Sequence, residues 1–392
     1  MTAYPRINTK VKTNSPFYIF YPEMLKKKID LFQRNFNGKI LYAVKANPSN
    51  FIIDRILKSG VNAFDVASIS EVKLIRANTL KSEIYFMNPV KARCSINEAY
   101  TNYKVKNFCI DSFEELKKID EETNNATDIS CQIRVEVPNN WSAINLSKKF
   151  GINKNEAPKL LRKLENKCQK IGLSFHVGSQ CMNPSAYEKG LEILKNVILQ
   201  SEVRVDSLNI GGGFPSNYEN YNSPSLIKYF SKINNYISRF QKDIGFACDL
   251  LAEPGRSLVS ECMSLIVQVI LRKKNHLFIN DGVHGSLNNA GYHNFNYPVR
   301  LLNNKKTKSD LIPFSLYGPT CDSNDFMKGP FYLPRDVSEG DYIEIRNMGA
   351  YSISMMNNFN GFSQKPKIFK LKEPSKKFHT EQLKWNKLEQ IT

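Results

Sequence analysis

The sequence of 392 residues contains no apolar run long enough to cross a membrane. Its first stretch, MTAYPRINTKVKTNSP, lacks the apolar core of a secretory signal peptide, so a cytoplasmic location is expected. The eight cysteines form no CxxC pair and no Cys/His ligand spacing. This pattern argues against a disulfide framework, and no bound metal is expected. No internal repeat is visible.

Acidic residues are scarce: 37 Asp and Glu stand against 55 Lys and Arg, which gives a formal net charge of +18. Residues 363–392 hold eight lysines and three glutamates, and the remaining excess is spread along the chain. The charge either reflects a composition rich in Lys, Asn, Ile and Ser or attracts an anionic substrate. Since no nucleic-acid-binding motif or basic–aromatic platform is present, nucleic acid is not expected as a partner.

Between about residues 38 and 260, short apolar strands alternate with amphipathic helical segments. This alternation predicts a (β/α)8 barrel of the TIM type. After Arg256, strands follow one another without helices, which predicts a C-terminal antiparallel β domain, and FYIFY at residues 17–21 could add a strand to it. The expected divisions are residues 1–30, an N-terminal segment joining the β domain; 31–256, the barrel; 257–372, the β domain; and 373–392, a lysine-rich tail or linker.

Lys45 stands in the motif YAVKAN, directly after the apolar run Lys39–Val44, which predicts a buried strand. At the end of such a strand a lysine amine is partly desolvated, and its pKa can fall. This is the environment that a lysine needs to bond covalently to a carbonyl compound. A solvated lysine at the rim of a strand is the plainer interpretation.

Further chemically interesting residues fall at expected strand ends, the face of a barrel where active sites lie. The three glycines of LNIGGGFP let backbone N–H groups approach a phosphate, or form only a flexible turn. Arg256 and Ser179 could contact the same phosphate. Glu253 ends an apolar strand and needs a cationic partner, which its neighbour Arg256 could supply. His176, in the expected apolar strand SFHV, is either a core residue or part of the site.

The motifs that carry chemistry follow one another in a family-specific order from Tyr42 to Phe362, over three quarters of the chain. They are YAVKAN, FDVAS, LSKKFG, FHVGSQ, LNIGGGFP, EPGRSLV, YGPTCDSND and NMGAYSISMMNNFNGF. In these motifs the chain resembles the fold-type III pyridoxal 5′-phosphate (PLP) decarboxylases of the ornithine/diaminopimelate decarboxylase family. The resemblance implies a two-domain, alanine racemase-like architecture and a PLP-dependent carboxy-lyase that removes the α-carboxylate of an L-amino acid as carbon dioxide.

The resemblance also implies roles for individual residues. Lys45 would bind PLP covalently, His176 would stack on its ring, and Glu253 would face the pyridine nitrogen. Asp65 and Glu71 would position the region around the Lys45 amine, and Tyr351 would reach the phosphate. The implied cofactor-binding set is Lys45, Asp65, Arg134, His176, Ser179, Gly211, Gly212, Gly213, Glu253, Gly255, Arg256 and Tyr351.

Cys321 and Asp322 lie in YGPTCDSND, a loop that in the resembling family enters the active site of the partner subunit. Cys321 is therefore expected to return a proton to Cα as a general acid, in a homodimer with shared active sites. Asp322 is expected to contact the substrate. Diaminopimelate decarboxylases typically carry glutamate after this cysteine, so the aspartate favours the ornithine-type branch.

One departure from the family concerns the far end of the substrate. Ornithine-type enzymes have a second acidic residue where this chain carries Tyr292 and His293, and no Asp or Glu occurs from Gly282 to Ser309. The sequence therefore indicates an ornithine/lysine decarboxylase-like enzyme with an altered distal pocket, and a substrate whose far end is bulky or anionic. The roles implied are polyamine biosynthesis or, alternatively, antibiotic biosynthesis. In the latter the enzyme would decarboxylate an aminocarboxypropyl group on a phosphorylated nucleotide–peptide, as in microcin C-type maturation.

Two alternatives of other kinds stay open at this point. A catalytically inactive regulatory homologue would share the fold, although every catalytic position is filled here. An amino-acid racemase of the same architecture would need a second base in place of Cys321.

Overall fold

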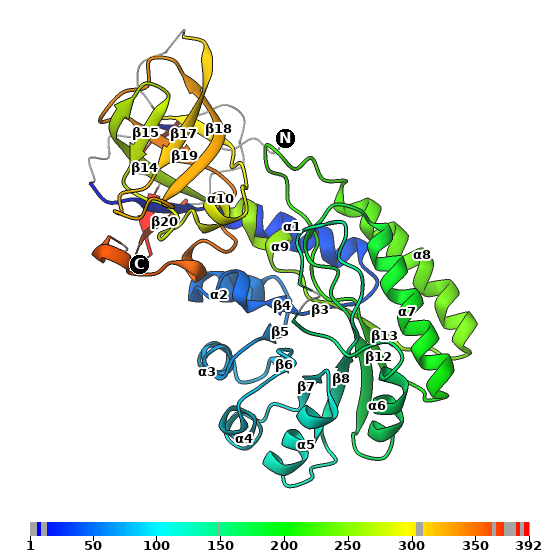
Figure 1. Cartoon of the computed structure of the whole chain (residues 1–392). Helices are drawn as coiled ribbons and strands as arrows, with labels where there is room; N and C mark the ends of the chain where they lie inside the picture. The colour runs from blue at the N-terminus through cyan, green and yellow to red at the C-terminus, as the bar shows by residue number, and fades with distance from the viewer. Residues whose placement is uncertain are drawn as a thin grey trace. The chain divides into compact units, whose positions relative to one another are not determined.

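The computed structural model describes residues 6–8, 14–146, 149–302, 309–362, 366–371, 382–384 and 388–391. The chain forms two compact units (Figure 1). One, the barrel unit, contains residues 26–216 and 223–257, and the other, the β unit, contains residues 1–25, 217–222 and 258–392. Among the described residues, no helix combines the length and apolarity needed to cross a bilayer.

The barrel unit is built on one parallel sheet in the order β3-β13-β12-β10-β8-β7-β6-β5-β4. Its strands are β3 (Lys39–Ile40), β4 (Tyr42–Ala43), β5 (Ala63–Val66), β6 (Glu83–Phe86), β7 (Asn107–Ile110), β8 (Ser130–Arg134), β10 (Lys170–Ser174), β12 (Ser207–Asn209) and β13 (Asp249–Ala252). β3 and β4 are halves of one stretch, interrupted at Leu41, whose N–H donates to the Ala252 carbonyl at 2.8 Å. Because β3 pairs with β13 and β4 with β5, this divided strand closes the barrel. The (β/α)8 prediction is confirmed.

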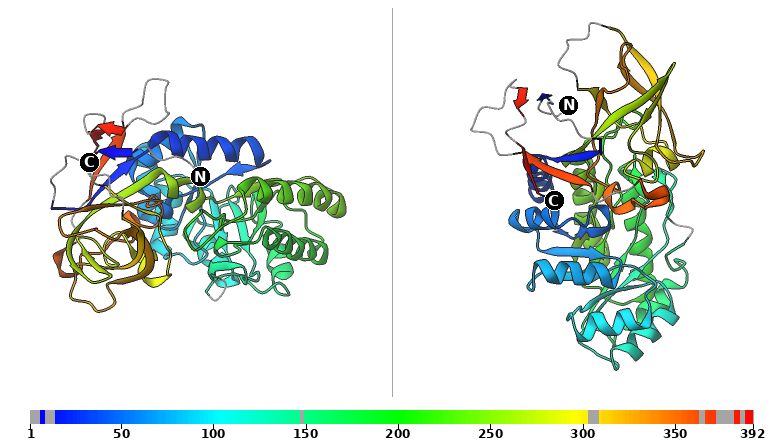
Figure 2. Two further views of the ribbon diagram at one scale, coloured as in Figure 1. Left: turned by 90° about the horizontal axis from the view of Figure 1, so that it is seen from above. Right: turned by 90° about the vertical axis from the view of Figure 1, so that its left-hand side faces the viewer.

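Helices surround these strands on the outside (Figure 1). They are α1 (Pro22–Asn35), α2 (Asn50–Lys58), α3 (Ile69–Asn78), α4 (Arg93–Thr101), α5 (Phe113–Glu122), α6 (Ala157–Leu164), α7 (Ser185–Ser201) and α8 (Leu226–Ile244). α3 and α5 begin at serines whose hydroxyls cap the helix N-terminus, Ser68 accepting from Glu71 N and Ser112 from Glu115 N. α7 and α8 lie side by side (Figures 1 and 2).

Residues 155–172, NEAPKLLRKLENKCQKIG, carry an amphipathic helical pattern, but the helix in the structure is shorter. α6 ends at Leu164, and β10 begins at Lys170. Residues 170–174 pair along their whole length with β8. This ladder places Ile171 and Leu173 in the core, so sheet pairing overrides the local helical pattern.

The β unit contains a sheet in the order β18-β17-β15-β14-β2-β20-β22, with β19 pairing β14 and β16. Its strands are β2 (Phe17–Phe20), β14 (Met263–Lys273), β15 (His276–Ile279), β16 (Val299–Leu301), β17 (Leu311–Tyr317), β18 (Phe326–Pro334), β19 (Tyr342–Ile345), β20 (Lys367–Leu371) and β22 (Leu388–Gln390). Pairing in this sheet is antiparallel except between β2 and β20 and between β15 and β17, which are parallel. β2, from the FYIFY segment, lies between β14 and β20, and its Phe17 and Ile19 are buried.

Candidate functional site

Lys45 lies in a 3-10 turn, Val44–Ala46, two residues after β4. The strand expected over Lys39–Val44 is shorter in the structure and ends at Ala43. The chain turns there because Asn47 N–H donates to the Val44 carbonyl at 3.0 Å. The Tyr42 hydroxyl stabilises the turn by donating to the Asn47 carbonyl at 2.9 Å. The Lys45 side chain remains 42% exposed, so its amine is accessible to a reactant.

The Lys45 amine forms an ion pair with Asp65 of β5, at 3.0 Å from Oδ2. Asp65 is only 2% exposed, so its charge is directed at this amine. Glu71, at the start of α3, accepts a hydrogen bond from Ala67 N–H at 2.6 Å. Burial raises the pKa of Glu71 and the Ala67 hydrogen bond lowers it, while the charges of Asp65 and Lys45 act in opposite directions. These three groups form one electrostatic cluster.

Glu253 follows β13 directly and accepts a hydrogen bond from the Asn209 amide at 2.7 Å. Burial, and then the negative charge of Asp65, raise the pKa of Glu253 to about 7. Lys45, the Asn209 hydrogen bond and Arg134 oppose this rise. A buried carboxyl held this close to neutrality is the kind of group that gains most from a cationic partner brought by a ligand.

His176 lies in the loop after β10, which ends at Ser174, so the expectation that it belongs to the strand was wrong. Two hydrogen bonds fix this loop: Gly178 N–H donates to His176 Nδ1 at 3.0 Å, and the Asn139 amide donates to the His176 carbonyl at 3.1 Å. Because Nδ1 is an acceptor, Nε2 carries the proton of the neutral ring. Burial, and then the charges of Arg134 and Lys45, hold the pKa of His176 well below its usual value. The site therefore presents a neutral imidazole.

The three glycines after β12 are required by close packing. Gly211 and Gly213 have φ of +66° and +94°, values that favour glycine. A Cβ at Gly211 would lie 2.2 Å from the Phe175 carbonyl oxygen, and one at Gly213 would lie 2.3 Å from that of Gly178. The Gly212 carbonyl accepts a hydrogen bond from the buried Tyr187 hydroxyl at 3.0 Å. The loop is thus preformed and free of side chains, as a phosphate-binding loop must be.

The side chains of Gln180 and Arg256 hold together the segments that flank this loop. The amide of buried Gln180 both donates to the Ser216 carbonyl and accepts from its N–H. Arg256 Nη2 donates to Ser179 Oγ at 3.3 Å, and Ser216 Oγ donates to the Arg256 carbonyl at the same distance. Gly255 packs close to Ala43 and Ala46, where a Cβ would be 2.9 Å from that of Ala46. The Arg256 guanidinium and Ser179 hydroxyl therefore belong to the same corner as the glycine loop.

The donor set of the barrel unit fits PLP. The glycine loop, Ser179 and Arg256 are suited to a phosphate dianion, the Lys45 amine to an aldehyde, and Glu253 to a pyridine nitrogen. Among the residues that the structure describes, no group of three or more His, Cys, Asp or Glu side chains could hold a metal ion.

In the β unit, Cys321 and Asp322 follow β17 in a loop that other segments hold in place. Asn360 accepts from Cys321 twice through Oδ1, from the thiol at 3.1 Å and from the N–H at 3.2 Å. Asp322 Oδ2 lies 2.8 Å from Nε2 of His284, and Asp322 Oδ1 accepts from Asn324 N–H at 2.9 Å. Cys321 is exposed and its thiol is the hydrogen-bond donor.

Of the remaining predicted residues, Arg134 ends β8 in the barrel unit, and Tyr351, Tyr292 and His293 lie in the β unit. Tyr351 has a φ of +54°, which is unusual for a bulky residue, and its carbonyl accepts from the Asn289 amide at 3.2 Å. Tyr292 ends α10 (Asn288–Tyr292) and is 55% exposed, and His293 caps it. The side chains of His284 and Asn324 contact Asp322.

Sequence reasoning missed four residues that organise these groups: Asn209, Gln180, Tyr187 and His284. Asn209 and Gln180 stand inside motifs that were recognised, LNIGGG and FHVGSQ, but their partners are distant in sequence. Tyr187 appeared only as an apolar position of α7. His284 stands in DGVHGS, where nothing local indicates that it meets Asp322.

Comparison with known proteins shows which family the chain resembles. Residues 23–260 match the family described as pyridoxal-dependent decarboxylase, pyridoxal binding domain. The chain is 28% identical to lysine/ornithine decarboxylase of Selenomonas ruminantium over 364 residues, which cover 90% of this chain and 89% of the relative. It is 31% identical to antizyme inhibitor 2 of Xenopus laevis over 359 residues, covering 84% and 75% respectively.

Among solved structures, the arginine decarboxylase of Paramecium bursaria Chlorella virus superposes with a TM-score of 0.81 at 27% identity. The similarity covers 91% of this chain and 96% of that one, so it extends over both units. The chain belongs to the ornithine/diaminopimelate decarboxylase family of fold-type III, PLP-dependent carboxy-lyases.

Proposed function

We propose that the protein decarboxylates an L-α-amino acid whose far end is bulky or anionic rather than a free ammonium. The observation that carries the decarboxylase chemistry is the Lys45 amine, 3.0 Å from buried Asp65 at the end of the barrel where Glu253 has its pKa raised to about 7. The proposal for the far end rests on Asp322, whose two oxygens already accept hydrogen bonds from His284 and Asn324.

PLP, when bound, supplies the electron-accepting ring that makes loss of carbon dioxide from an amino acid feasible. Lys45 would hold the cofactor through its amine, and Asp65 would keep this amine in place. An ionised Glu253 would favour a protonated ring nitrogen. The glycine loop, Arg256 and Ser179 would hold the phosphate by charge-assisted and backbone hydrogen bonds. Neutral His176 would offer an uncharged surface to the ring.

Cys321 returns a proton to Cα of the substrate after carbon dioxide has left. The supporting observation is that its thiol is exposed and already acts as a donor, toward Asn360 Oδ1. We propose that this loop works in the active site of a second subunit, so that the enzyme is a homodimer. Asp322, the next residue, would then contact the far end of the substrate.

The ion pair of Arg300 gives no support to an anionic far end. Arg300, one of the basic residues in the acid-free segment, is committed to buried Glu344 at 2.7 Å. Lys305, Lys306 and Lys308 lie outside the described residues. The proposal therefore rests on the hydrogen bonds that Asp322 already accepts and on the missing second acid. An aminocarboxypropyl group on a larger nucleotide conjugate is one substrate of this class.

Ornithine or lysine is the second candidate, favoured by the similarity to lysine/ornithine decarboxylase of Selenomonas ruminantium. The similarity to antizyme inhibitor 2 raises an inactive regulatory role, but the Lys45–Asp65 pair and the exposed Cys321 thiol favour an enzyme.

The test is carbon dioxide release by the PLP-loaded protein. Ornithine, lysine, arginine, O-phosphohomoserine and S-adenosylhomocysteine are compared side by side. Turnover of ornithine with kcat/KM on the order of 10⁴ M⁻¹s⁻¹ or above would defeat the assignment of the far end. Absence of release from every compound, together with no absorbance band of lysine-bound PLP, would defeat the decarboxylase itself.

Lys45→Ala should abolish both this absorbance band and turnover, and sodium borohydride should no longer fix the cofactor to the chain. For the shared site, inactive Lys45→Ala and inactive Cys321→Ala subunits are mixed. Partial recovery of activity is expected, because a hybrid dimer contains one intact site. No recovery, with subunit exchange confirmed by mass labelling, would show that each site is built within one chain.

A further inference from the structure

A chain of three hydrogen bonds in the β unit ends on the Asp322 carboxylate. Phe359 N–H donates to Asn357 Oδ1 at 3.0 Å, which orients the amide so that its Nδ2 faces Nδ1 of His284 at 3.3 Å. With Nδ1 as the acceptor, the proton of neutral His284 is on Nε2, 2.8 Å from Asp322 Oδ2. The neighbours thus assign the tautomer, and the imidazole donates to the aspartate.

The other oxygen of Asp322 is also engaged. Oδ1 accepts from the backbone N–H of Asn324 at 2.9 Å and from its side-chain amide at 3.1 Å. The Asn324 hydrogen bond first, and then the one from His284, lower the pKa of Asp322. The carboxylate is therefore ionised and meets three donors from its own chain, although it can accept about four hydrogen bonds.

The backbone on both sides of this pair is fixed by a buried carboxylate. Asp325, 3% exposed, accepts from Val283 N–H at 2.7 Å through Oδ1 and from the Thr320 hydroxyl at 2.7 Å through Oδ2. It thereby connects the segment that carries His284 to the loop that carries Asp322. The His284 ring also packs against Phe359, with ring centroids 4.7 Å apart. The histidine and the aspartate are thus held together before any substrate arrives.

We propose that His284 is a specificity-determining residue whose hydrogen bond to Asp322 weakens the binding of cationic groups to this carboxylate. The inference rests on the proposed function, in which Asp322 meets the far end of the substrate. An ammonium is a donor only. The three donors of the chain leave Asp322 about one acceptor site, so an ammonium can occupy that single site or must displace the imidazole N–H. Far ends that carry no ammonium do not need this acceptor site. His284 thereby lowers the affinity of the site for amino acids with a cationic far end relative to all others.

The test compares two substitutions of this histidine. His284→Phe removes the donor and keeps an aromatic ring against Phe359, while His284→Gln retains an N–H donor. KM and kcat for carbon dioxide release are measured with ornithine and with S-adenosylhomocysteine. His276→Phe is the matched control, because His276 is an exposed histidine of the same unit that also contacts an aromatic ring, that of Tyr317.

His284→Phe is expected to lower KM for ornithine about tenfold or more, the usual effect of freeing a charged hydrogen-bond acceptor, with little change in kcat. His284→Gln and His276→Phe should stay within about twofold of the parent protein. If His284→Phe acted through a general loss of structure, kcat would fall for both substrates. His284→Gln would then show the same fall in kcat. An unchanged or higher ornithine KM in a folded His284→Phe protein would overturn the proposal, since His284 would then not restrict cations.

A binding measurement separates this inference from the proposed function. If the parent protein turns over no amino acid tested, calorimetry with 1,4-diaminobutane still reports on the Asp322 carboxylate. Tighter binding of this diamine to His284→Phe than to the parent and to His284→Gln supports the role of His284. Equal binding to all three proteins contradicts it. Should His284→Phe fail to fold, His284→Leu removes the same donor and is measured in its place.

Discussion

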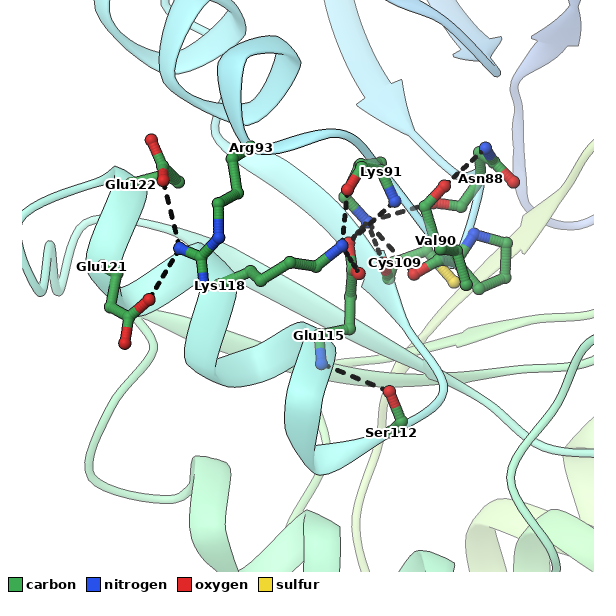
Figure 3. A network of polar contacts seen from close by, with 11 residues as sticks. Asn88, Val90, Lys91, Arg93, Cys109, Ser112, Glu115, Lys118, Glu121 and Glu122 are labelled. Atoms are coloured by element: carbon green, nitrogen blue, oxygen red, sulfur yellow. Dashed lines mark hydrogen bonds and ion pairs between the residues drawn. The ribbon is translucent and has the colours of Figure 1, made fainter.

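Lys91 offers the sharpest stability prediction, because its ammonium is fully buried in the barrel unit (Figure 3). It lies 2.9 Å from Glu115 Oε1 and donates to the carbonyls of Cys109 at 2.5 Å and Asn88 at 3.0 Å. Burial lowers the pKa of Lys91, and Glu115 opposes this. The lysine thus connects the loop after β6, the end of β7 and the first turn of α5.

The substitution Lys91→Met keeps the volume and removes the charge. Glu115 would retain Lys118, whose ammonium is 2.6 Å from Oε2, so its charge would not be left alone. The carbonyls of Asn88 and Cys109 would lose a charged donor in a buried place. Breaking a buried pair from one side costs about 3–5 kcal/mol, and the remaining Lys118 places the expected loss near the lower end, about 3 kcal/mol.

Urea unfolding of the cofactor-free protein measures this loss as a shift of the midpoint at constant slope. The control is Arg93→Met, which removes a cation bound to Glu121 and Glu122 on the exposed surface of the same region (Figure 3). It should shift the midpoint far less. The double variant Lys91→Met/Glu115→Gln should lose less free energy of unfolding than the two single variants lose in sum. Equal midpoints for Lys91→Met and Arg93→Met would refute the reasoning.

Three further predictions concern the barrel site. Because the pKa of Glu253 is raised to about 7 in the folded protein, this group makes the cofactor-free protein less stable as pH rises from about 4.5 to 7, by at most about 3 kcal/mol. Urea midpoints at pH 5 and 7.5 should differ less in Glu253→Gln, and an unchanged difference would contradict the assignment. Gln180→Gly tolerates the φ of +56° but loses both hydrogen bonds to Ser216, so PLP affinity should fall about tenfold in a fluorescence titration. Equal affinity would show that the loop needs no such anchor. Tyr187→Phe takes the donor from the Gly212 carbonyl and should lower the Tm by about 2–6 °C by calorimetry, whereas an unchanged Tm would mean that water replaces the hydroxyl.

The barrel could be predicted from sequence because its strands are short apolar runs separated by helical patterns. The runs around Phe64, Ile84, Phe108 and Ile133 each became a buried strand of the parallel sheet. The places where strands stop could not be predicted as well. Lys45 follows a turn closed by its own backbone, and His176 lies beyond a ladder that ends at Ser174. Strand ends depend on which backbone groups of other strands remain available, and this is a tertiary property.

The side chains that support the site were harder to find for a related reason. Asn209 contacts Glu253 across 44 residues, Gln180 contacts Ser216 across 36, and His284 meets Asp322 across 38. No local period or motif encodes such pairs. A motif identifies the residues that perform chemistry, whereas their hydrogen-bond partners become visible only when distant segments fold together.

Glu253 and Asp322 show how such partners decide what a carboxyl group can do. Glu253 is buried and accepts a hydrogen bond from the Asn209 amide. Burial and the charge of Asp65 raise its pKa to about 7, so a cation from a ligand would stabilise its ionised form. Asp322 is partly exposed and accepts from Asn324 and His284, so its pKa falls and its charge is already balanced by donors of the chain. The first group is prepared to gain from a protonated ring nitrogen. The second has little to gain from an ammonium unless His284 is removed, and this difference is what the His284 variants measure.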